Sequence, residues 1–223
     1  MMSQFRPKYV TFDCYGTLTN FQMAEAAQDL YRAHLPEPQM AALVRDFAAY
    51  RLDEVLGDWK PYADVIHNAL ERACKRNDVT FKAEHAQMVY DRVPSWGPHP
   101  DVPAGLAKVA KEIPLVILSN AMNAQLPSNV AKLGAPFHAA LTAEQAQSYK
   151  PRMKGFEYMF DTLGCRPEDV VHCSSSFRYD LMTAHDLGIK NKVWVNRGHE
   201  PANPNYGYVE IKDIGGLPGV FGL

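Results

Sequence analysis

The chain has 223 residues, of which 47% are hydrophobic and 22% are charged, a balance typical of soluble globular proteins. Its formal net charge of -2 argues against a nucleic-acid partner or an anionic membrane surface. No segment approaches the roughly 18 uncharged residues that a membrane span needs, and the opening stretch "MMSQFRPKYV" lacks the apolar core of a signal peptide. We therefore expect a cytoplasmic protein, whose four scattered cysteines are reduced thiols.

The first predicted strand is the apolar run "YVTF" at residues 9–12. The region from about residue 21 to 98 then contains several helix-like segments and no convincing strand. Residues 41–56 and 62–76, for example, carry apolar side chains at helical spacing. An all-helical block directly after the first strand predicts an inserted cap domain, which we assign to residues 19–98.

Three further apolar runs are predicted as buried strands, at residues 113–119, 169–174 and 192–196. Helix-like stretches accompany them at residues 100–112, 122–134, 152–164 and 177–188, and the last three end at Gly134, Gly164 and Gly188. This alternation predicts an α/β fold. The core would be a Rossmann-like parallel sheet with its helices, formed by residues 1–18 and 99–223.

Polar residues stand close to the ends of the predicted strands, and open parallel sheets form their active sites at the carboxyl ends of strands. In chain order they are Asp13 with Thr17, Ser119 with Asn120, and Ser174–Ser176 with Asp180, and a loop before the last group carries Lys150. Each alone has a plain structural explanation, such as a helix cap or a solvated lysine. Their joint order indicates a catalytic site.

Four motifs resemble those of the haloacid dehalogenase superfamily, and within it the L-2-haloacid dehalogenase group. They are "FDCYGTLT", "VILSN", "YKP" and "VVHCSSSFRYD", and the resemblance covers essentially the whole chain. It implies that Asp13 is a nucleophile, which forms a covalent ester that water then breaks. The phosphatases of the superfamily use magnesium and a second acid two residues after the nucleophile. Here that position is Tyr15, which argues against a phosphatase and predicts a reaction without metal or cofactor.

The resemblance also assigns roles to other residues. Lys150 would lower the pKa of Asp13 through its charge, and Asp180 would hold Lys150 and help orient the hydrolytic water. An arginine of the cap assists halide departure in this group, and Arg45 in "ALVRDFAAY" is the best match, with Arg51 as the alternative. The residues expected at the substrate are Thr17, Tyr15, Ser119, Asn120, Ser175 and Phe177.

Three positions depart from the group. Phe156 stands where a tyrosine is usual, Phe177 replaces an asparagine, and Arg178 is additional. They predict a divergent branch. The expected reaction converts a 2-haloalkanoic acid into a 2-hydroxy acid and halide, and the alternatives are a fluorinated acid or azetidine-2-carboxylate as substrate.

Two rival functions remain, a magnesium-dependent phosphatase and a non-catalytic binding or scaffold protein. Tyr15 counts against the first, and the intact catalytic set counts against the second. His172 and four other histidines lack metal-ligand spacing and are assigned to packing or to the surface. A homodimer is left open.

Overall fold

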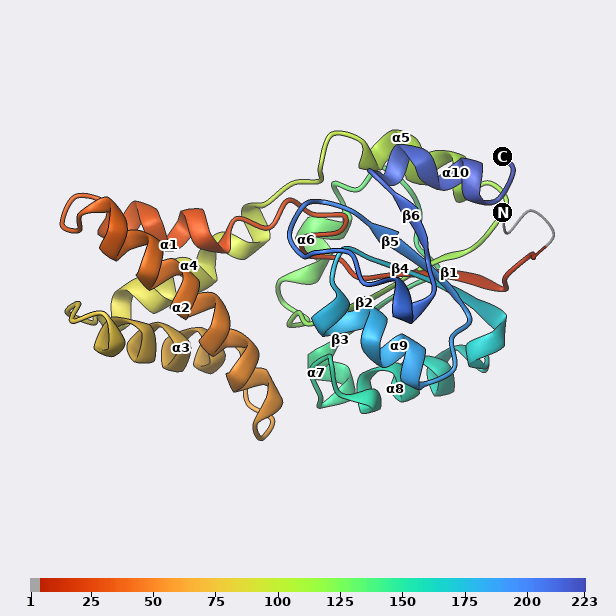
Figure 1. Cartoon of the computed structure of the whole chain (residues 1–223). Coiled ribbons are helices and arrows are strands. Elements are labelled where there is room, and N and C mark those ends of the chain that lie inside the picture. Colours follow the sequence, from red (N-terminus) through yellow and green to blue (C-terminus); the bar gives the residue numbers. More distant parts are fainter. Residues whose placement is uncertain (1–4) are drawn as a thin grey trace. The chain divides into compact units, whose positions relative to one another are not determined.

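The computed structural model describes residues 5–223 of the chain (Figure 1). Two compact units make up the chain: one runs up to Asn20 and continues with Gly97–Leu223, and the other is Phe21–Trp96. Within the first unit, the two segments that lead to and from the second are tied together, because the Asn20 N–H donates to the Gly97 carbonyl over 2.9 Å. Residues 1–4 lie outside the described residues. They include the start of the predicted α/β core domain and the start of the opening segment that lacks the apolar core of a signal peptide.

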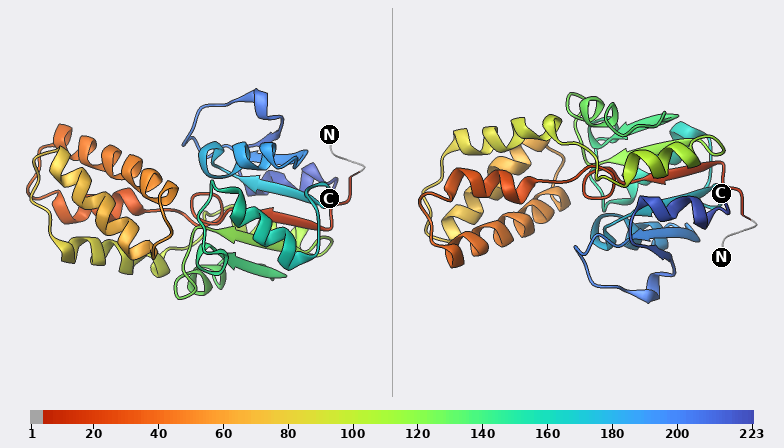
Figure 2. Two further views of the ribbon diagram at one scale, coloured as in Figure 1. Left: turned by 90° about the horizontal axis from the view of Figure 1, so that it is seen from below. Right: turned by 90° about the horizontal axis from the view of Figure 1, so that it is seen from above.

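The first unit is built on a six-stranded parallel sheet. Its strands are β1 (Tyr9–Phe12), β2 (Leu115–Ser119), β3 (Ala139–Thr142), β4 (Val170–Ser174), β5 (Asn191–Val195) and β6 (Val209–Ile211). Their order across the sheet is β3-β2-β1-β4-β5-β6, and Figure 2 shows the sheet in two further views. The order reverses at β1, since the chain builds outward to β3 on one side and to β6 on the other. Ligands bind at the carboxyl ends of strands at such a reversal.

Helices cover both faces of this sheet (Figures 1 and 2). One face carries α5 (Val102–Val109), α6 (Leu126–Val130) and α10 (Leu217–Val220), and the other carries α8 (Met153–Leu163) and α9 (Met182–Asp186). Val10 and Phe12 belong to the apolar cluster of the first face. Because side chains alternate along a strand, Thr11 faces the other side. The predicted fold class, an α/β core with an inserted helical region, is confirmed.

The sequence prediction found β1, β2, β4 and β5 and missed the two strands at the edges of the sheet. The central strands are continuous apolar runs, since helices cover both of their faces. β3 has the sequence "AALT", and β6 has only three residues, "VEI". β1 is as short as β3 but consists of aromatic and β-branched residues, which strands favour, whereas half of β3 is alanine. The remaining short elements of this unit are α7 (Ala143–Ala146), η2 (Pro167–Asp169), the π-helix η3 (Phe177–Leu181), η4 (Pro204–Tyr206) and η5 (Ile214–Gly216).

The second unit is entirely helical. It contains α1 (Met23–Tyr31), α2 (Glu37–Leu56), α3 (Tyr62–Arg76), α4 (Ala83–Arg92) and the short η1 (Val93–Ser95). On α3, Ile66, Leu70 and Ala73 are buried at intervals of three or four residues, so one stripe of the helix faces its neighbours. Leu43 and Phe47 supply the corresponding stripe on α2.

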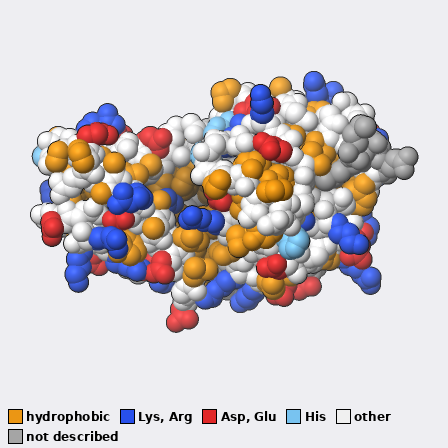
Figure 3. Space-filling model, in the orientation of Figure 1, with side chains coloured by type: hydrophobic (Ala, Val, Ile, Leu, Met, Phe, Trp, Pro, Cys, Tyr) orange, Lys and Arg blue, Asp and Glu red, His pale blue; other side chains and the backbone are white. Residues whose placement is uncertain are grey.

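The surface carries both signs of charge. Figure 3 shows lysine, arginine, aspartate and glutamate side chains interspersed on the visible face, in keeping with a net charge of -2. No helix between residues 5 and 223 is long and apolar enough to cross a membrane. The four cysteines are free thiols and all are buried.

Candidate active site

The residues predicted at the strand ends come together at the carboxyl edge of the sheet. Asp13 follows β1, Ser119 ends β2 and Ser175 follows β4. The strands are in register here, with Phe12 paired to Ile117 on one side and to Cys173 on the other. Asp13 therefore stands where the strand order reverses, and its backbone N–H donates to the Cys173 carbonyl over 3.1 Å.

A tight loop after β1 presents the Asp13 side chain. Gly16 in this loop has a φ of +92°, which is unfavourable for residues with a Cβ, and its N–H donates to the Thr19 carbonyl over 2.8 Å. The turn brings the Thr17 hydroxyl to Asp13, where it donates to Oδ2 over 2.7 Å. Thr17 Oγ1 also accepts the Ser175 N–H over 2.9 Å, so this hydroxyl links the loop to β4.

Lys150 supplies the positive charge of the site. Its ammonium is buried and has three acceptors: Asp180 Oδ1 at 2.7 Å, the Leu118 carbonyl at 2.8 Å and Asp13 Oδ1 at 2.9 Å. The Asn120 side chain holds the lysine backbone from both sides, since it donates to the Lys150 carbonyl and accepts the Lys150 N–H. Lys150 thus uses all three donors, two of them on carboxylates.

Asp180 is fully buried on the π-helix η3. Its Oδ1 accepts bonds from Lys150 and from His172 Nε2, the latter at 3.1 Å. Its Oδ2 has no hydrogen-bond partner among the described residues. The start of η3 is capped by Glu200, whose carboxylate accepts the Ser176 hydroxyl over 2.7 Å and the Phe177 N–H over 3.0 Å. The loop around Glu200, which the sequence left without a role, therefore fixes the helix that carries Asp180.

The pKa values of the two carboxyls in the cluster are shifted in opposite directions. Burial raises the pKa of Asp13, and the charge of Asp180 adds to this, although Lys150 and Thr17 oppose it. Burial also opposes ionisation of Asp180, but Lys150 and the His172 bond outweigh it and lower the pKa of this carboxyl. The expected lowering of the Asp13 pKa by the charge of Lys150 is present, but burial and Asp180 outweigh it, because one buried ammonium serves two buried carboxylates.

Asp13 is the best nucleophile in its loop. Burial raises the pKa of the neighbouring Cys14 to about 12, so that this thiol stays protonated near neutral pH. Burial disfavours the ammonium of Lys150 as well, yet the charges of Asp13 and Asp180 outweigh this effect and raise its pKa. Lys150 is therefore a fixed cation, and the arrangement is suited to attack by an aspartate with formation of an ester.

Residues 7–188 match the family of haloacid dehalogenase-like hydrolases. The chain belongs to this family. It is 27% identical over 188 residues to the (S)-2-haloacid dehalogenase of Xanthobacter autotrophicus, covering 81% of this chain and 72% of that one. It is 26% identical over 209 residues to (S)-2-haloacid dehalogenase 4A of Burkholderia cepacia, covering 90% and 87%.

Solved structures give the same fold. A dehalogenase with an intermediate complex superposes with a TM-score of 0.81 at 19% identity, covering 97% of this chain and 98% of the other. The L-2-haloacid dehalogenase of Xanthobacter autotrophicus gives a TM-score of 0.77 at 20% identity, covering 96% and 98%. The superfamily that the four motifs predict is thus confirmed, together with the similarity to L-2-haloacid dehalogenases.

Two side chains of the site bear on magnesium, which phosphatases of this superfamily use. The Lys150 ammonium is bonded to both Asp13 and Asp180, so the pair of carboxylates already shares a cation. At the position of the second acid, the Tyr15 phenol donates to Asn129 Oδ1 over 2.9 Å. A phenol cannot serve as the carboxylic acid that those phosphatases place at this position.

Two residues predicted to bind substrate have other structural roles in this hydrolase. The Phe177 ring is buried beside Trp194, Tyr206 and Tyr208, with the Trp194 ring centroid at 5.1 Å, and so anchors η3 to this aromatic cluster. Asn120 spends its side chain on the backbone of Lys150. Ser119 differs from both, since its Oγ is buried and has no hydrogen-bond partner among the described residues.

The candidate arginines of this hydrolase both lie on α2, in the helical unit. The Arg45 side chain is 71% exposed within this unit, and its Nε lies 3.6 Å from Asp46 Oδ1. The Arg51 guanidinium packs between the rings of Phe21 and Phe47, at 5.2 and 5.0 Å from their centroids. Arg45 is thus the more exposed cation, and Arg51 is held between two aromatic rings.

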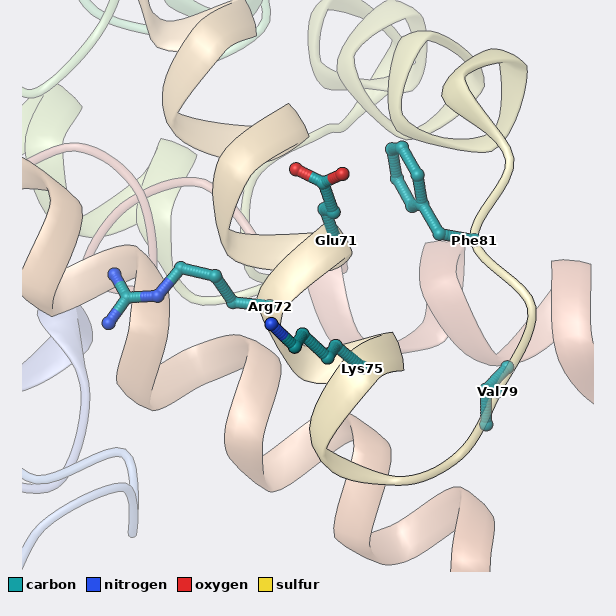
Figure 4. A pocket seen from close by; sticks show the side chains of 5 residues that line it. All are labelled: Glu71, Arg72, Lys75, Val79 and Phe81. Atoms are coloured by element: carbon teal, nitrogen blue, oxygen red, sulfur yellow. The ribbon is translucent and has the colours of Figure 1, made fainter.

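A hollow of about 420 Å³ lies elsewhere in the helical unit. Its lining is Glu71, Arg72, Lys75, Val79 and Phe81, which come from α3 and the segment after it (Figure 4). None of these residues belongs to the Asp13 cluster, and Arg72 is already paired with Glu54 at 2.7 Å. We assign no catalytic role to this hollow.

Proposed function

We propose that the protein cleaves the carbon–halogen bond of a 2-haloalkanoic acid through a covalent ester on Asp13. The observation that carries this proposal is the ion pair between Asp13 and Lys150, together with Tyr15 at the position two residues after Asp13 where the phosphatases have a second acid. The two (S)-2-haloacid dehalogenases to which the chain is similar support it.

The first half-reaction would be a substitution at the carbon next to the substrate carboxylate. An oxygen of Asp13 forms a bond to that carbon from the side opposite the halogen, and the halide leaves with the bonding electrons, which inverts the centre. The unpartnered Ser119 Oγ and the Ser175 hydroxyl are suited to hold the substrate carboxylate. Thr17 and Lys150 would keep Asp13 aligned during attack.

The second half-reaction would break the ester at the aspartyl carbonyl. Water bonds to Cγ of Asp13, the bond between Cγ and the ester oxygen (the Asp13 oxygen that attacked the substrate) breaks, and this departing oxygen takes a proton to become the hydroxyl of a 2-hydroxy acid. The second proton of the water is released as Asp13 returns to its carboxylate. Asp180, with one oxygen not engaged by protein, is suited to orient this water.

A halide-release screen over 2-chloro-, 2-bromo- and fluoro-acids, with and without a chelator, tests the proposal. We expect release from at least one 2-haloacid, unchanged by EDTA, because the Lys150 ammonium already serves both carboxylates. Azetidine-2-carboxylate and phosphate monoesters belong in the same screen. Phosphate release that EDTA abolishes and magnesium restores would establish the phosphatase instead, and no turnover of any substrate would favour the binding or scaffold protein.

We expect the acid limb of the pH profile to lie above the pH at which an ordinary aspartate titrates. Asp13 must be ionised to attack, and burial and Asp180 raise its pKa, so activity falls as pH drops through this raised value. The measurement is kcat/KM for halide release against pH. An acid limb at the ordinary aspartate pKa of about 3.9 would contradict this assignment.

Arg45→Ala is expected to slow halide release about 100-fold, as loss of a group that stabilises a leaving anion does in other enzymes. Arg51→Ala should change the rate much less but lower the melting temperature, because its guanidinium packs between two rings. Pre-steady-state halide release and thermal melting of both variants separate the two effects. Equal rate losses would show that Arg45 has no special part in halide departure.

A further inference from the structure

His172, in the middle of β4, contacts the site carboxylate Asp180 and has no role in the reaction described above. Its ring is fully buried and lies between two polar groups, with Nδ1 2.8 Å from Thr11 Oγ1 and Nε2 3.1 Å from Asp180 Oδ1. Thr11 and His172 are paired residues of the adjacent strands β1 and β4. The sheet register itself therefore places the threonine against the imidazole.

The partners determine where the imidazole carries its proton. An ionised carboxylate can only accept, so Nε2 must carry a hydrogen and donate it to Asp180. In the neutral ring Nδ1 is then an acceptor, which the Thr11 hydroxyl can satisfy. The same hydroxyl lies 3.3 Å from the Val171 carbonyl and can turn to it, so both protonation states of His172 keep the Nε2 bond to Asp180.

The ring has little freedom to turn away from Asp180. The Phe156 ring stands edge-on against it, with centroids 5.1 Å apart and an interplanar angle of 69°. Phe156 is itself fully buried on α8, in the apolar cluster on that face of the sheet. A polar side chain held this way in an apolar wall is costly unless its hydrogen bonds are made.

Lys150 and His172 both bond to Oδ1 of Asp180, while Oδ2, which is also buried, has no hydrogen-bond partner within residues 5–223. Lys150 alone would leave the carboxylate able to rotate, because an ammonium is a donor without a preferred plane. The second donor, His172 on β4, fixes Oδ1 as the oxygen that is hydrogen-bonded to the protein and leaves Oδ2 for a water molecule.

We propose that His172 is a positioning residue that holds Asp180 with one oxygen open to the hydrolytic water. This inference rests on the proposed function, and it concerns only the second half-reaction, in which the Asp13 ester is cleaved. Thr11 acts behind His172 by fixing the ring, and neither residue touches the substrate. The first half-reaction uses Asp13 and Lys150 and would depend on His172 much less.

His172→Leu and His172→Gln separate positioning from packing. The glutamine amide can place an N–H near the position of Nε2, whereas leucine fills the space without a donor. Rapid-quench experiments would follow halide release and, by mass spectrometry of the Asp13 peptide, decay of the ester. We expect His172→Leu to slow ester decay about 10- to 100-fold, the effect of losing a hydrogen bond to a charged group, so that the ester accumulates. His172→Gln should recover most of this rate.

A second measurement does not depend on any substrate. Carbon NMR of protein with labelled aspartate, assigned with Asp180→Asn, reports the titration of the Asp180 carboxyl. We expect its pKa to rise in His172→Leu and to stay close to the wild-type value in His172→Gln. The matched control is His138→Leu, which removes a histidine that also stacks on an aromatic ring, Tyr9 at 5.2 Å, and should change neither readout.

Several outcomes would overturn the inference. Folded His172→Leu with unchanged ester decay and an unchanged Asp180 titration would show that the bond has no consequence. Equal impairment of the glutamine and leucine variants would reduce His172 to a packing residue. If the wild-type protein released no halide from any acid, the proposed function would fail, and the NMR titration alone would then decide whether His172 controls Asp180.

Discussion

A single turnover in oxygen-labelled water, with enzyme in excess over substrate, is expected to leave the label on Asp13 and to give an unlabelled 2-hydroxy acid. The hydroxyl oxygen of the product comes from the aspartate, because the solvent oxygen enters at the aspartyl carbonyl carbon. Mass spectrometry of the peptide that contains Asp13 and of the product measures both. Label in the product alone would mean that water attacks the substrate directly and that Asp13 is a general base.

The turnover rate of Asp13→Asn tests the same role of Asp13 as a nucleophile. A neutral amide is a poor nucleophile, so we expect turnover to fall on the order of 10⁴-fold or more, as when other enzymes lose their nucleophile. Asp169→Asn is the control, since this aspartate is paired with Lys8 at the surface and has no part in the site. Its turnover should match that of the wild-type protein.

The second large effect is expected from Lys150→Met. This change leaves two buried carboxylates without their shared cation, and removing one partner of a buried ion pair typically costs about 3–5 kcal/mol. We expect the free energy of unfolding at neutral pH to fall by an amount of this order and activity to be lost. Urea denaturation followed by circular dichroism measures the first quantity.

The pH dependence of this loss has a definite sign. Without the lysine, burial raises the pKa of both carboxyls, so the folded variant binds more protons than its unfolded chain, and its stability rises as pH falls from neutral towards the ordinary aspartate value of about 3.9. The difference from the wild-type protein should therefore shrink in acid. A constant difference would mean that the carboxylates are not the cause.

Lys192→Met is the matched control for this prediction. Lys192 is also buried, on β5, but its ammonium donates to the Ile189 carbonyl over 2.6 Å and has no ion pair among the described residues. Its loss should cost at most about 1 kcal/mol, the value of an ordinary hydrogen bond, and should leave activity unchanged.

The sequence predicts those parts of the fold and site that depend on local patterns. The four central strands are continuous apolar runs, and Asp13, Ser119 and Ser175 stand directly at strand ends, so the parallel sheet brings them to one edge. The loop residue Lys150 is found through the motif around it and not through its own surroundings. The edge strand β3 is half alanine, which is depleted in strands, and β6 has only three residues, so neither produces a strand pattern.

What the sequence does not predict depends on long-range contacts. The role of Asn120 appears only when its amide is seen on both backbone groups of Lys150, thirty positions later in the chain. His172 carries one signal, a histidine inside an otherwise apolar strand, but only the register with Thr11 and the approach of Asp180 give it a partner. The packing of Phe177 against Trp194 likewise depends on residues that lie later in the chain.

The hydrogen bond between Asn20 and Gly97 bears on how the helical region can change. The chain leaves the first unit and returns to it at neighbouring backbone positions, so the length of the segment between them does not change the geometry of the first unit. Even for a flexible loop, doubling the length costs only about 0.6 kcal/mol of closure entropy. We therefore expect insertions, deletions or wholesale exchange of residues 21–96 to leave the aspartate, the lysine and the sheet beneath them intact.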